Sequence, residues 1–333
     1  MVNITKAIMH ILDATACTKI CSDVELDLGD EKTCEFLTRH VERAYKDPGL
    51  KFGEFRENSD FMVKLCNYLE GSDSFLNLSH FTANLMYQAI SDSDKVDSSD
   101  VVVCEFQDGD KTILAILKLA HKKCFTHQVS NDSGQVNVKL INHYAILPNL
   151  SQKLDEYAFI DTKTLKIRFV DKLREMDGKE AYTFSDGILK CTSSPSPKET
   201  LKMVNEITQT VAENYGSNVA TAVSKLKNCI VESGEMSDFI DPLEIGKEIF
   251  GSSKAMQDAY VEQLKEANVP EKVEVSESLL VNTGKNHKIK TDTGIEISFP
   301  VDYFKNKDFM EFINNPDGTI SIQLKNIGKI TNK

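Results

Sequence analysis

The sequence predicts an α+β protein of two domains, the first built around a largely antiparallel sheet flanked by helices and the second mostly helical with terminal β-hairpin strands. Two patterns support this prediction. Before residue 190 apolar and polar residues alternate along several segments, as in strands, whereas beyond residue 197 apolar residues recur at the spacing of helices. Serine and proline cluster between the two patterns, so we place the domains at residues 1–190 and 191–333.

Strands of the first domain are predicted where the alternation or an apolar run is longest. These segments are residues 4–12, 23–28, 101–106, 112–119, 136–140 and 165–169. The clearest hairpin joins residues 101–106 to 112–119 through a turn at Asp108 and Gly109. Its apolar run is nearly continuous, which indicates strands that are covered on both faces.

Three helices are predicted between the early strands and this hairpin. Asp30 is a candidate N-cap for the first helix, which should end at residues 47–49, where proline and glycine follow an aspartate. The second helix should begin near Ser59 and the third after the polar run 71–74. Each has an apolar stripe at helical spacing, so we expect all three to pack against the sheet.

The second domain is predicted to hold four helices followed by strands. The helical segments are residues 201–211, 219–230, 242–250 and 254–264, and the strands lie at 295–299 and 320–324. The two short helices have the outline of a helix-turn-helix. However, the second of them carries Asp258, Glu262 and Glu266, whereas a helix in the major groove normally offers basic or amide side chains. An ordinary packed helical pair is the competing interpretation.

The composition is that of an ordinary globular protein, but the charge is negative, with 39 basic against 51 acidic residues and a net charge of −12. Such a surface repels DNA unless its basic residues are gathered locally. The N-terminal residues lack the order of a signal peptide and no run of 18 apolar residues follows, so we expect a cytoplasmic protein with no membrane partner. Eight scattered cysteines fit reduced thiols.

Motifs for enzyme chemistry are missing from the sequence. It contains no G-x-G-x-x-G, no G-x-x-x-x-G-K-[ST] and no G-x-S-x-G, which leaves nucleotide hydrolysis and serine-hydrolase chemistry unsupported. His121, Cys124 and His127 form the densest metal-competent cluster. On a strand the two histidines share a face and the cysteine points to the other, so one ion would not reach all three. We therefore expect no catalytic residue, no metal site and no cofactor.

Basic residues are nevertheless distributed unevenly, as DNA binding requires. Residues 111–143 carry five lysines and one acid, residues 163–174 carry five basic residues and one acid, and residues 285–290 add three lysines. The candidate DNA-binding residues are Lys111, Lys118, Lys122, Lys123, Lys139, Lys163, Lys166, Arg168, Lys172, Arg174, Lys285, Lys288 and Lys290. If these segments fold onto one surface, they could contact phosphates, and binding would weaken steeply with salt.

Several stretches together resemble the NdpA/YejK nucleoid-associated protein family of bacteria. They are LKFGEFRENS at residues 50–59 with the helix that follows to Ile90, the hairpin 101–119, the helix pair after Asp241, and the segments 294–300 and 318–322. The resemblance spans nearly the whole chain and implies a non-enzymatic nucleoid protein that binds DNA and contacts type II topoisomerase subunits. The sequence departs from the family at residues 182–187, where Asp186 stands in place of basic residues.

Two functional hypotheses follow. In the first, the chain is an architectural or regulatory DNA-binding protein that contacts phosphates through lysine-rich strands, largely independent of base sequence. In the second, it is an acidic interaction module that docks on DNA-handling enzymes such as a type II topoisomerase. Residues 23–60 favour the second, since eleven acids outnumber six bases there. A metal-dependent nuclease is a third possibility, supported by residues 121–127 alone. Whether the protein is a homodimer also remains open.

Overall fold

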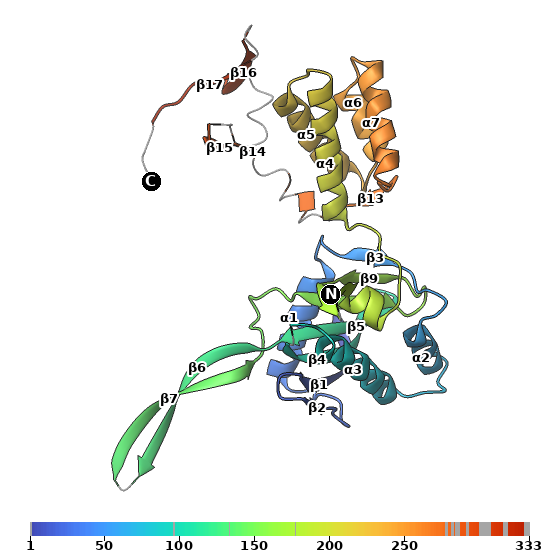
Figure 1. Ribbon diagram of the computed structural model, residues 1–333, viewed down its shortest axis with the longest axis vertical. Helices are drawn as coiled ribbons and strands as arrows, with labels where there is room; N and C mark the ends of the chain where they lie inside the picture. The colour runs from blue at the N-terminus through green and yellow to red at the C-terminus, as the bar shows by residue number, and fades with distance from the viewer. Residues whose placement is uncertain are drawn as a thin grey trace. The chain divides into compact units, whose positions relative to one another are not determined.

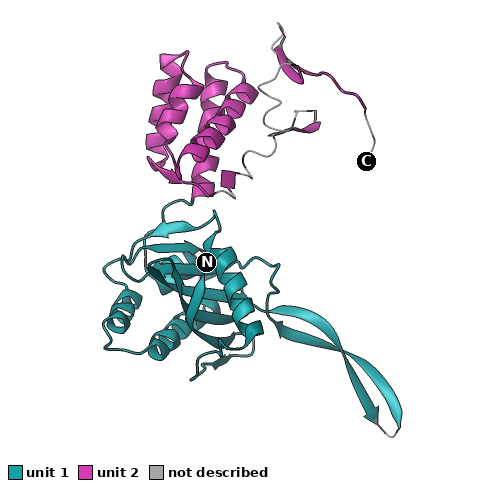
Figure 2. Cartoon of the chain, turned by 180° about the vertical axis from the view of Figure 1, so that it is seen from behind, with its two compact units in different colours: residues 1–196 teal, residues 197–333 magenta. Residues whose placement is uncertain are grey.

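The computed structural model divides the chain into two compact units, Met1–Ser196 and Pro197–Lys333 (Figure 2). The residues that it describes are 2–95, 97–132, 134–176, 178–276, 279–280, 283, 287–290, 293–299, 308–315 and 319–329. Antiparallel strands with helices make up the first unit, and helices followed by small strand pairs make up the second. This arrangement confirms the α+β fold class.

A seven-stranded sheet forms the centre of the first unit (Figure 1). Its strands are, in order across the sheet, β2 (Thr18–Ile20), β1 (Asn3–Asp13), β4 (Ser98–Asp108), β5 (Lys111–Ala120), β8 (Glu156–Asp161), β9 (Ile167–Val170) and β3 (Lys51–Gly53). Every neighbouring pair is antiparallel, as predicted. β4 and β5 form the predicted hairpin, but its turn lies at Gly109 and Asp110, because Asp108 pairs with Lys111.

Helices cover both faces of this sheet. α1 (Glu31–Tyr45) packs on one face, and α2 (Asp60–Leu69) and α3 (Phe75–Ser91) pack on the other. Alternate residues of β4 therefore reach different cores: Val101 lies in the core shared with α2 and α3, and Val102 lies in the core shared with α1. The apolar run is buried on both faces, as its continuity indicated.

The predicted N-caps begin the first helices. The Asp30 carboxylate accepts the backbone N–H of Thr33 at 3.0 Å, and the Ser59 hydroxyl accepts that of Met62 at 3.1 Å. Ser74, within the polar run expected before the third helix, caps α3. Each cap satisfies a backbone donor that the first turn leaves free, so these helix starts follow the local sequence.

The strand predicted at residues 23–28 is wrong. β2 pairs with the end of β1, and the segment that follows runs beside β1 with a backbone hydrogen bond of 2.8 Å from the Leu26 N–H to the Ala7 carbonyl. Val24 is 73% exposed while Leu26 is half-buried, so the alternation belongs to a loop that turns one side toward the protein. β9 is also shorter than predicted, because Leu165 has a positive φ of 57° in the preceding turn.

β6 (Lys122–Asp132) and β7 (Gln135–Ile146) form a separate two-stranded sheet, which we call the ribbon. The ribbon follows β5 and extends beyond the seven-stranded sheet before the chain returns to β8 (Figure 1). The strand predicted at residues 136–140 lies within β7. The remaining elements of the first unit are β10 (Leu173–Met176), β11 (Lys179–Tyr182) and the π-helix η1 (Thr183–Ile188).

The second unit packs the four predicted helices around one apolar core. They are α4 (Pro197–Asn214), α5 (Val219–Met236), α6 (Pro242–Ile249) and α7 (Lys254–Glu266). The strand pairs are β12 (Phe239–Ile240) with β13 (Val273–Glu274), β14 (His287–Lys290) with β15 (Glu296–Phe299), and β16 (Met310–Asn314) with β17 (Ile320–Leu324). β15 and β17 confirm the predicted tail strands. Within the described part of the chain, no helix is both long and apolar enough to cross a bilayer.

Candidate nucleic-acid interface

Two of the candidate DNA-binding residues lie inside the first unit. The side chains of Lys118 on β5 and Arg174 on β10 are only 3% and 5% exposed. The Lys118 ammonium lies 2.8 Å from a Glu156 oxygen and 2.9 Å from an Asp97 oxygen. The Arg174 guanidinium reaches the same two oxygens at 2.6 and 3.2 Å. These four residues, the buried charge cluster, neutralise one another, so neither base is available to a phosphate.

The buried charge cluster keeps its acids ionised. Burial raises the pKa of Glu156, but the charges of Lys118 and Arg174 lower it by more, and the net shift is downward. The pKa of Asp97 is lowered by the same balance. Burial lowers the pKa of Arg174, and the two carboxylates raise it by more. The cluster thus joins β5, β8 and β10 as ion pairs, and its role is structural.

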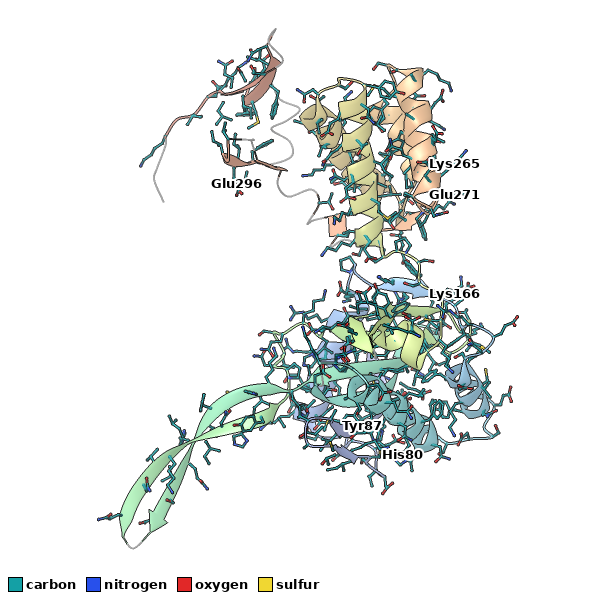
Figure 3. All side chains as sticks on the ribbon, viewed as in Figure 1. His80, Tyr87, Lys166, Lys265, Glu271 and Glu296 are labelled. Atoms are coloured by element: carbon teal, nitrogen blue, oxygen red, sulfur yellow. The ribbon has the colours of Figure 1, made fainter. Side chains whose placement is uncertain are left out.

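A first group of exposed bases lies at the end of the sheet where β4 turns into β5 and β8 turns into β9. It comprises Lys111, Lys163 and Lys166, the last of which is labelled in Figure 3. Arg168 on β9 is half-buried and places its guanidinium carbon 4.2 Å from the ring centroid of Tyr45. Three carboxylates, those of Asp108, Asp110 and Asp161, lie in the same turns as these bases. This end of the sheet therefore has mixed charge, which weakens its attraction for phosphate.

A second group of exposed bases, Lys122, Lys123 and Lys139, lies on the ribbon. Residues 122–146 hold these three lysines and one acid, Asp132, so the ribbon carries a net charge of +2 in a chain of −12. The backbone pairing places residue 132 beside the turn, whereas Lys122 and Lys123 lie at the base of the ribbon and Lys139 lies between, where it pairs with Gln128. The ribbon is thus locally cationic, as contact with phosphate requires.

The structure does not bring the candidate residues that it describes in the first unit onto one surface. Lys111 begins β5 and the ribbon follows the end of that strand, so about 30 Å of extended chain separates the two groups. Lys172 is exposed between β9 and β10. Lys285 lies outside the described residues, as do the side chains of Lys288 and Lys290, whose backbone belongs to β14. Of the two groups of exposed candidate bases, the one on the ribbon has fewer acids among it.

The two faces of the ribbon differ in character, a feature that the sequence analysis missed. Directly paired residues share a face of an antiparallel sheet. Gln128 pairs with Lys139 on a polar face, whose described side chains are Cys124, Thr126, Gln128, Ser130, Gln135, Asn137, Lys139, Ile141 and His143. Val129 pairs with Val138 on the opposite, apolar face. The alternation at residues 136–140 predicted one apolar face on β7. Which residues of β6 share that face follows only from the pairing of the two strands.

The candidate metal cluster is dispersed. His121 lies before the ribbon, where its Nε2 is 2.7 Å from a carboxylate oxygen of Asp100. Cys124 and His127 are exposed and lie on opposite faces of the ribbon, as strand geometry indicated. Among the described residues, no group of three or more His, Cys, Asp or Glu side chains is arranged to hold a metal ion.

The short helices of the second unit pack on each other. Gly246 of α6 lies against the ring of Tyr260 of α7, which is fully buried. Lys254 at the start of α7 lies 3.3 Å from Asp258, so this base already has an acidic partner. Close packing and paired charges fit the interpretation of α6 and α7 as an ordinary helical pair.

An acidic groove lies along α1. Its volume is about 570 Å³, and its lining residues are Leu28, Glu31, Cys34, Glu35, Thr38, Arg39 and Glu42. Three glutamates and one arginine give the lining a net charge of −2. Arg39 binds Glu35 at 3.0 Å, which leaves the other two glutamates to set the sign of the groove. This groove belongs to the acidic segment 23–60.

Comparison with known proteins assigns the chain to a family. No curated protein matches it. A protein-family model described as Nucleoid-associated protein YejK matches residues 8–331, which is nearly the whole chain. The match confirms the resemblance drawn from the sequence. The chain therefore belongs to the nucleoid-associated protein YejK family.

Proposed function

We propose that this protein is a non-enzymatic nucleoid protein that binds duplex DNA through the polar face and basal lysines of its ribbon. The observation that carries the proposal is the charge of the ribbon, +2 over residues 122–146, in a chain whose net charge is −12. The chain belongs to a family described as nucleoid-associated, which also supports association with DNA.

The chemistry of the polar face supports this contact. Thr126, Gln128 and Asn137 are exposed there beside Lys139, and hydroxyl and amide side chains donate hydrogen bonds to phosphates and base edges. A two-stranded ribbon also fits the major groove of B-form DNA, which is about 12 Å wide. With three lysines and no arginine on the ribbon, we expect phosphate contacts to dominate and base preference to be weak.

Salt dependence tests the proposal with a matched control. The variant K122Q/K123Q/K139Q removes three charges from the ribbon, and K111Q/K163Q/K166Q removes three exposed charges from the other end of the sheet. If three phosphates are neutralised per bound chain, the logarithm of the association constant falls with the logarithm of salt with a slope of about −2.7. Affinity should then drop roughly 40-fold between about 50 and 200 mM salt.

Anisotropy titrations with a labelled duplex of about 20 base pairs measure these slopes. We expect the ribbon variant to lose affinity and most of the slope, and the control variant to keep both. An unlabelled duplex of scrambled sequence should compete equally. Equal losses in the two variants, or no binding by the native protein at low salt, would show that the ribbon is not the DNA-binding element.

The acidic groove of α1 favours a second candidate function, docking on the basic surface of a DNA-handling enzyme such as a type II topoisomerase. Glu31 and Glu42 line it on the exposed side of the helix. A pull-down of that enzyme that survives nuclease treatment, and that is lost in E31K/E42K, would establish this function. Retention of the enzyme by E31K/E42K would exclude the groove as the docking site.

A further inference from the structure

The apolar face of the ribbon is a second surface, distinct from the polar face that we assign to DNA. Six large apolar side chains project from it, and they are Phe125, Val129, Val136, Val138, Leu140 and Tyr144. They are 59–78% exposed. The pairing of Val129 with Val138 and of His127 with Leu140 makes the face continuous across both strands.

The extent of this face matches one side of a stable protein interface. The six side chains together expose on the order of 800 Å², about the share that one partner contributes to a standard interface. A monomeric protein rarely leaves so large an apolar patch in water. The face is about 20 Å long from Phe125 to Asn131, which suits packing along the whole ribbon.

The charge of this face argues against nucleic acid as its partner. Lys123 is its one cation, placed at the base of the ribbon with its ammonium 5.5 Å from the ring of Tyr144. Further along the face, the polar members are His127, Asn131 and Asn142. Contact with phosphates needs a row of basic side chains. Apolar side chains placed against the hydrated sugar–phosphate backbone of DNA would stay in contact with water and gain no free energy from burial.

A second copy of the chain fits the face best. A two-fold interface buries the same patch on both subunits, so the patch must be self-complementary, and a nearly uncharged apolar strip meets this condition without like charges opposing each other at its centre. An isolated two-stranded hairpin is marginally stable in water, so the ribbon needs a cover. The ribbon of a second copy can provide that cover, and a second copy is present whenever the protein is expressed.

We propose that the protein forms a homodimer in which the apolar faces of two ribbons pack against each other. The four strands then make a small two-layer sandwich with the six apolar side chains of each chain between the layers. The polar faces point outward on both sides. The proposal rests on the apolar face and the pairing register, and it holds whether or not the polar faces bind DNA.

Sedimentation velocity of the full chain tests the dimer in the absence of DNA. We expect the native protein to sediment with twice its chain mass of 37.3 kDa at about 10 µM. Val138→Lys and Leu140→Lys each place a charge in the buried layer and should weaken the dimer by at least about 100-fold. The matched control, Asn137→Lys, adds the same charge to the neighbouring position on the polar face and should remain dimeric.

The variants should keep the fold of the first unit, because Val138 and Leu140 are exposed in the single chain and lie outside its two apolar cores. An unchanged thermal transition of the first unit verifies this. A native protein that sediments as a monomer up to about 50 µM overturns the proposal. A dimer equally strong in Val138→Lys and Leu140→Lys also overturns it, since the contact would then lie elsewhere.

Discussion

Replacing Lys118 with methionine separates a structural role for this lysine from a DNA-binding one. Its ammonium lies within 2.9 Å of both Glu156 and Asp97, and methionine keeps the apolar stem while removing the charge. Breaking a buried ion pair costs about 3–5 kcal/mol. Because Arg174 still contacts both carboxylates and Asp97 is about a third exposed, we expect the lower end, about 3 kcal/mol. That is roughly a 150-fold shift in the folding equilibrium of the first unit.

The assay must report on the first unit alone, because the two units can unfold separately. Hydrogen exchange of peptides from β5 and β8 during a urea titration meets this need in a protein without tryptophan. Lys111→Met, at the exposed start of the same strand, is the control and should change stability by less than about 0.5 kcal/mol. An unchanged urea midpoint for Lys118→Met, together with weaker DNA binding, would refute burial of this lysine.

Two further predictions concern stability. Burial, helped by the nearby His80, lowers the pKa of His10 from 6.5 to about 4, so the unfolded chain binds a proton at a higher pH than the folded one. The free energy of unfolding of the first unit should therefore fall by about 2 kcal/mol between pH 6.5 and 4. In a pH series of urea titrations, His10→Gln should remove that fall. Parallel profiles for the two proteins would contradict this. Gly246→Ala would drive a Cβ into the ring of Tyr260 and should destabilise the second unit by about 1–3 kcal/mol. A native melting curve for the second unit would show that the ring can move aside.

Local signals in the sequence predicted much of the fold. Asp30, Ser59 and Asp241 cap helices where expected, because an N-cap depends on a few neighbouring residues. The β4–β5 hairpin was predicted for a similar reason, since its turn and its apolar run are contiguous. The strand prediction at residues 23–28 failed because alternation records only which side of a segment is buried, whereas a strand also needs a ladder of backbone hydrogen bonds. This segment runs beside β1, to which the Leu26 N–H donates a hydrogen bond at the Ala7 carbonyl, and the structure assigns no strand there.

The buried charge cluster shows which part of the candidate site was predictable. Lys118 lies between Leu117 and Leu119 in a run that the sequence already indicated to be covered on both faces, so its burial could have been inferred. The positions of its acidic partners could not. Asp97 and Glu156 lie 21 and 38 residues away along the chain, and only the strand order β4-β5-β8 brings them together. Without these partners, Lys118 looks like any other basic residue available to DNA.

For the ribbon, the sequence shows the alternation of apolar and polar residues, but it does not show whether the apolar face is buried or exposed. Alternation at Val136, Val138 and Leu140 is typical of a strand with one apolar face, and in most domains such a face packs on a core. Here those side chains stay largely exposed, outside the apolar cores of the first unit. An apolar strip of this size that the fold leaves in water gains free energy from any cover that excludes water from it. The ribbon therefore combines a local net charge of +2 with a large exposed apolar strip, so if two ribbons pair, their lysines and polar faces reach DNA as a pair.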